Sequence, residues 1–185
     1  PVTGPDEAGL DAVFVANTMR VMFQGGYSTM VASIGSLTQT LLHHPGVLEE
    51  IQANPGLTPT AVEEIVRFDG PVQGTSRVAV TGTTLRGQTI AAGQTVLTLY
   101  AAANHDPEAF DRPGELLLSR SPNPHLGFGW GPHSCLGTIS AQTVLSALLT
   151  TLAGHPAALR AAGPAQRDTT ATMRRLAVLP VTFQP

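Results

Sequence analysis

The feature that most constrains the fold is one unusually long helical pattern. Apolar residues recur at helical spacing across residues 10–43, and Pro45 ends the pattern. A helix of this length is a rod of roughly 50 Å, whereas a compact domain as long as this chain has a radius of gyration of about 16 Å. The rod is too long to be covered by this chain alone. We therefore expect a large part of the fold to lie outside this sequence or to come from a separate chain.

Around this rod the sequence predicts short helices and small sheets. Residues 1–9 read as a polar linker, and a short helix is expected over 46–52. Thr58 is expected to cap the next helix, over 58–68, with Pro59 at its first position. The chain is therefore predicted to be mainly α with small β-sheets. The remaining expected elements are a β region over 73–100, a proline-rich irregular stretch over 106–126, a glycine-rich loop over 127–137, a helix over 138–153, and small strands near Met173 and Val178.

Composition narrows the class of protein. The chain is 42% hydrophobic and 12% charged, which is enough apolar material for a core. The net charge of -3 provides no basic field for nucleic acid, and no apolar run approaches the ~18 residues of a membrane span. The only cysteine is Cys135, so a disulfide framework within the chain is excluded. We expect a cytoplasmic protein with no nucleic-acid or membrane partner.

The loop around Cys135 has the residues that a metal-binding thiolate needs. Cys135 is expected at the start of a helix, where the helix dipole and free N–H groups stabilise a thiolate. Gly131 and Gly137 place no side chain beside the sulfur, so a flat macrocycle can approach the backbone. His133 can reach a carboxylate at the rim of such a macrocycle. Taken alone, however, a single cysteine is more often a buried, inert side chain.

The spacing within this loop favours the functional interpretation. Phe128, Gly131, His133, Cys135 and Gly137 match five positions of the haem-binding loop of the cytochrome P450 family, which this segment resembles. The resemblance implies the C-terminal, haem-binding half of that fold, with the long central helix over the haem and the cysteine loop beneath it. It implies that Cys135 binds the iron of haem b. The implied activity is that of a bacterial haem–thiolate monooxygenase in secondary metabolism, which oxidises a small organic molecule with dioxygen and electrons from a ferredoxin-type donor.

Two further segments resemble the same family. Glu64 and Arg67 lie three apart on a helix and can form an ion pair; alone, such a pair is usually solvated, but the family has a structural Glu–Arg pair here. The family also adds an arginine two residues after a proline. Glu115 occupies that position, and Arg112 is the possible substitute. Arg77 falls where the family binds a haem propionate, although it can also be an ordinary strand arginine.

The middle of the long helix contains Gly25 and Gly26, each costing about 1 kcal/mol relative to alanine. The resemblance implies that this helix crosses the oxygen-binding face of the haem, with small residues and a local widening that leave room for dioxygen. Thr29 matches a threonine that delivers protons, and Ser28 stands where an acid is expected. Close packing of the two glycines is the structural alternative. The residues expected to line a substrate pocket are Phe23, Tyr27, Val72 and Gln73.

Several departures leave other functions open. Gln142 and Val144 replace charged residues of the family's electron-donor docking face, so docking of a ferredoxin-type donor is expected to be weak or atypical. Together with Ser28 and Glu115, Gln142 favours a non-catalytic homologue that stabilises a partner enzyme. The cysteine loop argues against that alternative, because a scaffold needs no reactive thiol. Oxygen-independent haem chemistry, such as peroxide use or rearrangement, is a third possibility.

The chain is shorter than a whole family member, which has roughly twice its length. A fragment, one chain of a split protein and a naturally short homologue remain open, and a fragment or partial chain is favoured. In the first two cases the missing N-terminal half of the fold is itself a partner. A zinc site is not expected, since one cysteine and scattered histidines do not form a metal cage.

Overall fold

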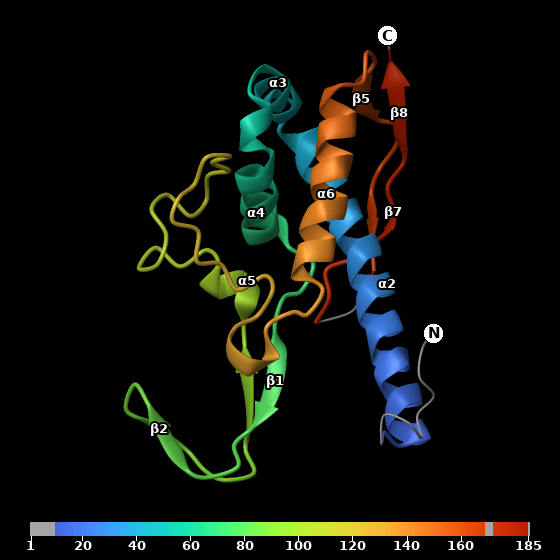
Figure 1. The fold of residues 1–185 in the computed structure, drawn as a ribbon. Helices are drawn as coiled ribbons and strands as arrows, with labels where there is room; N and C mark the ends of the chain where they lie inside the picture. The colour runs from blue at the N-terminus through green and yellow to red at the C-terminus, as the bar shows by residue number, and fades with distance from the viewer. Residues whose placement is uncertain (1–9, 169–171, 185) are drawn as a thin grey trace.

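A computed structural model describes residues 10–168 and 172–184, so the expected linker over residues 1–9 lies outside the described residues. Four helices form the centre of the molecule (Figure 1). Helix α4 packs on α6 and on α2, and α3 packs on α6. The predicted mainly α architecture with small sheets is confirmed, and no helix in the described part is long and apolar enough to span a membrane. The four helices are α2 (Ala12–His43), α3 (Gly46–Ala53), α4 (Thr58–Asp69) and α6 (Thr138–Ala153).

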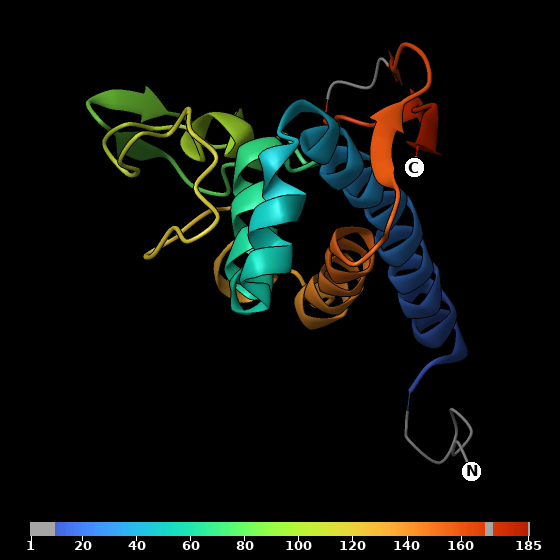
Figure 2. The same ribbon diagram turned by 90° about the horizontal axis from the view of Figure 1, so that it is seen from above.

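Helix α2 has two unlike halves. It begins after Asp11, whose side chain accepts the Val13 N–H at 3.1 Å, and ends at His43. Its C-terminal half is buried against the other helices, whereas its N-terminal half extends away from them in both views (Figures 1 and 2). Large apolar side chains on that half, such as Met19 and Phe23, are exposed to solvent. The chain itself therefore covers only part of its longest helix.

A continuous apolar core joins the helices. Helix α4 contributes four buried apolar residues because its amphipathic pattern repeats on one face. They pack against buried leucines of α2 and α6, and each such side chain contributes about 1.5–3 kcal/mol on burial. This core fixes α4 beside α6, and thereby positions the loop that leads into α6. Its central members are Leu37, Leu41, Ala61, Val62, Ile65, Val66, Leu145 and Leu149.

Small antiparallel pairs flank the helices. Strand β1 (Thr75–Val78) pairs with β4 (Thr95–Thr98), with Arg77 opposite Val96. Between them, β2 (Thr83–Leu85) and β3 (Gln88–Ile90) form a hairpin. At the other end of the molecule, β5 (Ala158–Ala161) pairs with β8 (Val181–Gln184). The pair of β6 (Gln166–Arg167) and β7 (Leu176–Val178) follows, with β7 beside α2. The strand expected near Val178 is β7, and Met173 forms an isolated bridge with Val72.

The structure corrects the expected start of α4. Thr58 does not act as an N-cap, because a 3-10 turn, η1 (Pro55–Leu57), leads directly into the helix. Thr58 already has helical dihedral angles, and its hydroxyl donates to the Pro55 carbonyl at 2.9 Å. The short helix α5 (Tyr100–Ala103) and the strands β5, β6 and β8 were not predicted from the sequence. Residues 106–126 contain no helix or strand, as expected for the irregular stretch.

Candidate functional site

The Glu64–Arg67 pair is fully buried. Arg67 Nε and Nη2 donate to the two Glu64 carboxylate oxygens at 2.8 and 2.9 Å, and neither side chain has any exposed surface. The remaining Arg67 N–H groups donate to the carbonyls of Asn104, Pro113 and Glu115 at 2.7, 2.9 and 3.0 Å. The pair is therefore not a solvated surface pair. It ties the irregular stretch to α4.

The second arginine of this cluster is Arg120, which corrects the expected substitution at Glu115. Arg120 Nε donates to both Glu64 oxygens at 2.9 and 3.1 Å, and its side chain is 6% exposed. Glu115 offers only its backbone carbonyl to the cluster, while its carboxylate pairs with Arg112 at 3.0 Å in solvent. The charge beside the Glu64–Arg67 pair is therefore not reversed, and Arg112 does not take the place of the second arginine. Arg120 was available in the sequence as the last arginine before the cysteine loop.

Glu64 is held as a carboxylate. Burial raises its pKa, but hydrogen bonds from Arg67, the Leu117 N–H and Arg120 outweigh burial and leave the pKa below its usual value. The Leu117 N–H donates to Oε1 at 2.9 Å. Removal of a partner from this buried carboxylate should lower the stability of the fold, because a buried charge that loses its partners is costly in free energy.

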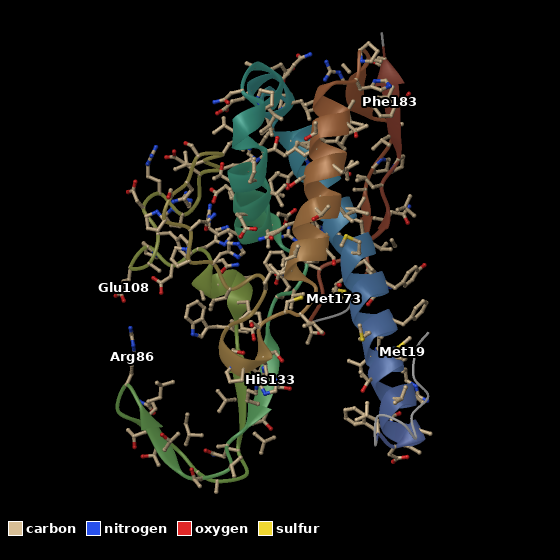
Figure 3. The ribbon with its side chains drawn as sticks, viewed as in Figure 1. Met19, Arg86, Glu108, His133, Met173 and Phe183 are labelled. Carbon is tan, nitrogen blue, oxygen red and sulfur yellow. The ribbon has the colours of Figure 1, made fainter. Side chains whose placement is uncertain are left out.

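The cysteine loop enters α6 through a 3-10 turn, η2 (Gly131–His133). Cys135 follows that turn and lies three residues before Thr138, the first residue of α6, which is slightly outside the expected helix start. Its N–H donates to the Phe128 carbonyl at 2.7 Å, which closes the loop. Figure 3 labels His133 on this loop, at the end of α6 away from β5 and β8. Gly129 has a φ of 72° and Gly131 one of 71°, a conformation that favours glycine.

The surroundings of Cys135 fit a flat, apolar metal complex. The thiol is free and exposed. A Cβ added to Gly137 would lie 3.7 Å from the sulfur, so the glycine keeps that flank open. Three large apolar side chains within five residues of Cys135 in the sequence, those of Trp130, Leu136 and Ile139, are 82%, 89% and 78% exposed. One sulfur ligand amid apolar side chains suits a haem better than a metal ion held by several protein groups, and no group of three such ligands occurs in the described part of the chain.

The glycines of α2 face open space. Outside the helix's own backbone, a Cβ added to Gly25 or Gly26 would meet no atom of the described residues within 4 Å, so packing against these residues does not explain the two glycines. The expected local widening is absent, because α2 is α-helical throughout. Thr29 Oγ1 donates to the Gly25 carbonyl, and Ser28 Oγ donates to the Gln24 carbonyl at 2.9 Å. Both hydroxyl protons are bound to the helix, which leaves the hydroxyl lone pairs to accept hydrogen bonds.

The other expected site residues lie on separate elements. Arg77 is exposed on β1 and donates to the Thr75 hydroxyl at 2.8 Å and to the Ser76 carbonyl at 2.9 Å. Phe23 and Tyr27 stack on the exposed half of α2, with ring centroids 6.0 Å apart. The remaining two, Val72 and Gln73, follow α4, where Val72 bridges to Met173 and the Gln73 amide donates to the Gly70 carbonyl. The described residues do not bring these four into one closed pocket.

A second polar cluster, which was not predicted from the sequence, lies beside the cysteine loop. His125 Nε2 lies 2.8 Å from Glu63 Oε2, and Gln142 Nε2 donates to Glu63 Oε1 at 2.6 Å. The Gly127 N–H donates to His125 Nδ1 at 3.0 Å. The His125 hydrogen bond lowers the pKa of Glu63; burial opposes it, and the Gln142 bond adds to the lowering. Gln142, expected on a donor-docking face, instead joins α6 to α4.

Comparison with known proteins decides the family. The model of the family described as cytochrome P450 matches residues 56–154, more than half of the chain. The chain belongs to the cytochrome P450 family. A biotin biosynthesis cytochrome P450 of Bacillus subtilis (strain 168) is 39% identical over 170 residues, which are 91% of this chain and 43% of that protein. A putative cytochrome P450 126 of Mycobacterium tuberculosis (strain ATCC 25618 / H37Rv) is 36% identical and is matched over 40% of its length. The chain thus spans less than half the length of these P450 relatives.

Solved P450 structures have the same arrangement over the matched part. The crystal structure of CalO2 superposes with a TM-score of 0.84 at 34% identity, covering 89% of this chain and 42% of CalO2. P450BioI, solved in complex with an acyl carrier protein ligated to hexadec-9Z-enoic acid, superposes with a TM-score of 0.81 at 40% identity. That match covers 85% of this chain and 41% of P450BioI. The fold is therefore the corresponding part of a P450.

Proposed function

We propose that this chain supplies the haem-binding part of a haem–thiolate monooxygenase. The observation that carries the proposal is the exposed Cys135 thiol on a glycine-rich loop with exposed apolar residues nearby in the sequence, in a chain of the P450 family. The proposed cofactor is haem b, which supplies activation of dioxygen when it is bound. The rest of the fold, some three-fifths of the relatives' length, is the proposed partner of the exposed half of α2.

Residues of this chain would divide the work around the haem. Cys135 would hold the iron as a thiolate, and the Cys135 N–H bond to Phe128 would keep the loop closed. His133 and Arg77, both exposed, would bind the propionates. Gly25 and Gly26 would leave space on the opposite face. The Thr29 hydroxyl donates its hydrogen bond to the Gly25 carbonyl. It would therefore accept a hydrogen bond from water and hold that water in place for proton delivery.

The proposed substrate is a small organic molecule of bacterial biosynthetic metabolism. Relatives and structural neighbours are named for biotin biosynthesis, a bacillaene polyketide synthase and vancomycin-type antibiotics. We propose a ferredoxin-type protein as electron donor. The exposed free thiol, which must stay reduced to bind iron, favours a cytoplasmic location.

The contacts of Arg120 and Gln142 count against a non-catalytic role, whereas the environment of Ser28 favours peroxide use. A non-catalytic role was favoured by departures at Ser28, Glu115 and Gln142. Two of these departures have a structural explanation: Arg120 supplies the second arginine that Glu115 does not, and Gln142 binds Glu63. Ser28 still lacks the acid's charge, and its proton is bound to Gln24. That observation favours peroxide use as the second candidate, since peroxide reaches the haem with its own protons.

The test is the absorption spectrum of the reduced, carbon-monoxide-bound whole protein. We expect the long-wavelength band of thiolate ligation in the wild type, and its loss in Cys135→Ser. A band typical of histidine ligation, or no haem uptake by correctly folded protein, would overturn the proposal. Turnover with hydrogen peroxide but not with a reductase and ferredoxin would favour the second candidate.

A further inference from the structure

Two adjacent carboxylates on α4 serve different clusters. Glu64 points into the arginines of the irregular stretch, whereas Glu63 binds His125 and Gln142. The His125 side chain is 3% exposed and that of Glu63 is 30% exposed. His125 is therefore a nearly buried side chain, linked to α4 and, through Glu63, to α6. The arginine cluster does not explain the burial of His125, because the hydrogen bonds of His125 are to Glu63 and to the Gly127 N–H.

The hydrogen bonds of His125 fix its tautomer. Nδ1 accepts the Gly127 N–H at 3.0 Å, so Nδ1 carries no proton. Nε2 then carries the proton and donates it to Glu63 at 2.8 Å. Gln142 holds the other oxygen of Glu63 at 2.6 Å and so restrains the carboxylate. The ring is consequently held in one orientation between the Gly127 backbone and Glu63 of α4, whose carboxylate Gln142 of α6 restrains.

The group that His125 holds is the first backbone N–H of that loop. A Cβ added to Gly127 would lie 2.5 Å from Val66 Cγ1 and 3.1 Å from His125 Nδ1, so Gly127 is seated tightly against α4. The next residue, Phe128, accepts the Cys135 N–H at 2.7 Å. The backbone group fixed by His125 and the carbonyl that holds Cys135 thus belong to consecutive residues.

We propose that His125 is a positioning residue for Cys135. Glu63 and Gln142 orient the imidazole, the imidazole fixes Gly127, and Phe128 transmits that position to the Cys135 backbone. The inference rests on the proposed haem-binding function and deepens it. Hydrogen-bonded groups that orient a metal ligand typically change metal affinity by about 10–100-fold when they are removed.

Two substitutions separate the two ends of the imidazole. In His125→Asn the side-chain oxygen can still accept the Gly127 N–H, as in an Asx-turn, but the link to Glu63 is lost. In His125→Gln the amide can still donate to Glu63, but the Gly127 N–H loses its acceptor. The matched control is His155→Gln, because His155 Nδ1 accepts the Ala157 N–H at 3.1 Å with the same two-residue spacing, on the exposed C-terminal side of α6.

The readouts are the rate of haem loss from the whole protein, the thiolate fraction of its carbon monoxide spectrum, and the midpoint of thermal unfolding. We expect His125→Gln to lose haem about 10-fold faster, with a lower thiolate fraction. In haem loss and thiolate fraction, His125→Asn should stay closer to the wild type than His125→Gln does. This should hold even if His125→Asn unfolds at the same temperature as His125→Gln or at a lower one. His155→Gln should match the wild type. If His125→Gln does not fold, Gln142→Leu should give a smaller change in the same direction.

Unchanged haem loss and thiolate fraction in His125→Gln would overturn the inference, as would losses that simply follow the unfolding midpoint in every variant. For Gln142→Leu, an unchanged rate and fraction would count against it in the same way. A wild type without a thiolate band would overturn the proposed function and this inference with it. A normal wild-type band with unaffected variants would overturn the inference alone.

Discussion

The arginine cluster (Glu64, Arg67 and Arg120) and the glycine segment of α2 (residues 25–29) belong to one chain but differ in what surrounds them. In the cluster, Arg67 and Arg120 are nearly buried and bind groups up to 56 residues away in sequence. In the glycine segment, side chains are largely exposed and the hydroxyls of Ser28 and Thr29 bind their own helix. The chain thus specifies its scaffold with its own residues. The face proposed for chemistry needs groups that the described residues do not supply.

The largest effect should come from breaking the buried pair. Arg67→Ala would remove one of the two arginines that pair with the buried Glu64 carboxylate, together with the guanidinium's bonds to three backbone carbonyls, and should lower the free energy of unfolding by about 3–5 kcal/mol. The matched control is Arg86→Ala, because Arg86 pairs with Glu108 at 3.5 Å in solvent and should matter by under about 0.5 kcal/mol. Denaturant unfolding of the whole protein measures both. Similar values for the two variants would show that the cluster adds nothing to the scaffold.

Arg120 should have the next largest effect. Arg120→Met removes donors to Glu64 while Arg67 still pairs with it, so we expect a loss of about 1–3 kcal/mol. Arg112→Met, at an exposed arginine on the same stretch, should change stability by under about 0.5 kcal/mol. The same unfolding assay applies. A larger loss for Arg112 than for Arg120 would restore the original assignment of the second arginine.

Acid should weaken the contacts of the two adjacent carboxylates of α4. The folded pKa values of Glu63 and Glu64 lie below the ordinary value of 4.5. A carboxyl whose pKa is lowered on folding contributes stability that is present above its unfolded pKa and is lost as pH falls through the folded pKa. Stability should therefore fall as pH drops below about 4.5. Glu64→Gln should flatten this dependence; an equally steep fall in that variant would assign the acid response to other groups.

Alanine substitution at two glycines should have opposite signs. Gly25→Ala should stabilise by about 1 kcal/mol, because a Cβ there meets nothing within 4 Å and alanine favours helix. Gly127→Ala should destabilise by about 1–3 kcal/mol, because its Cβ would press on Val66. Thermal unfolding of the two variants measures this contrast. A destabilised Gly25→Ala variant would show that α2 packs closely against something at this point.

The smallest effect on stability is expected at Thr29. Thr29→Ala removes a hydroxyl bound only to its own helix and should change stability by under about 0.5 kcal/mol. We expect it instead to lower the product formed per reducing equivalent, and Ser28→Asp to raise it by restoring the family's acid. Product, hydrogen peroxide and cofactor consumption are measured together. Full coupling in Thr29→Ala would exclude that hydroxyl as the proton relay.

Local patterns could be predicted from the sequence, and distant contacts could not. The long helix, the Glu64–Arg67 spacing and the cysteine loop each depend on residues a few positions apart. Arg120 meets Glu64 across 56 residues and His125 meets Glu63 across 62, through a stretch without helix or strand. No periodicity links such residues. The local widening of α2 was expected only from resemblance, and the helix is regular there.

The carbonyls bound by Arg67 have a consequence for how the molecule opens. Residues 106–126 have no helix or strand of their own, yet one side chain of α4 holds backbone oxygens at Asn104, Pro113 and Glu115. The stretch cannot separate from the helix without releasing that guanidinium. Its amide protons should therefore exchange with deuterium together with those of α4, as one cooperative unit, rather than at the rapid rate usual for a loop.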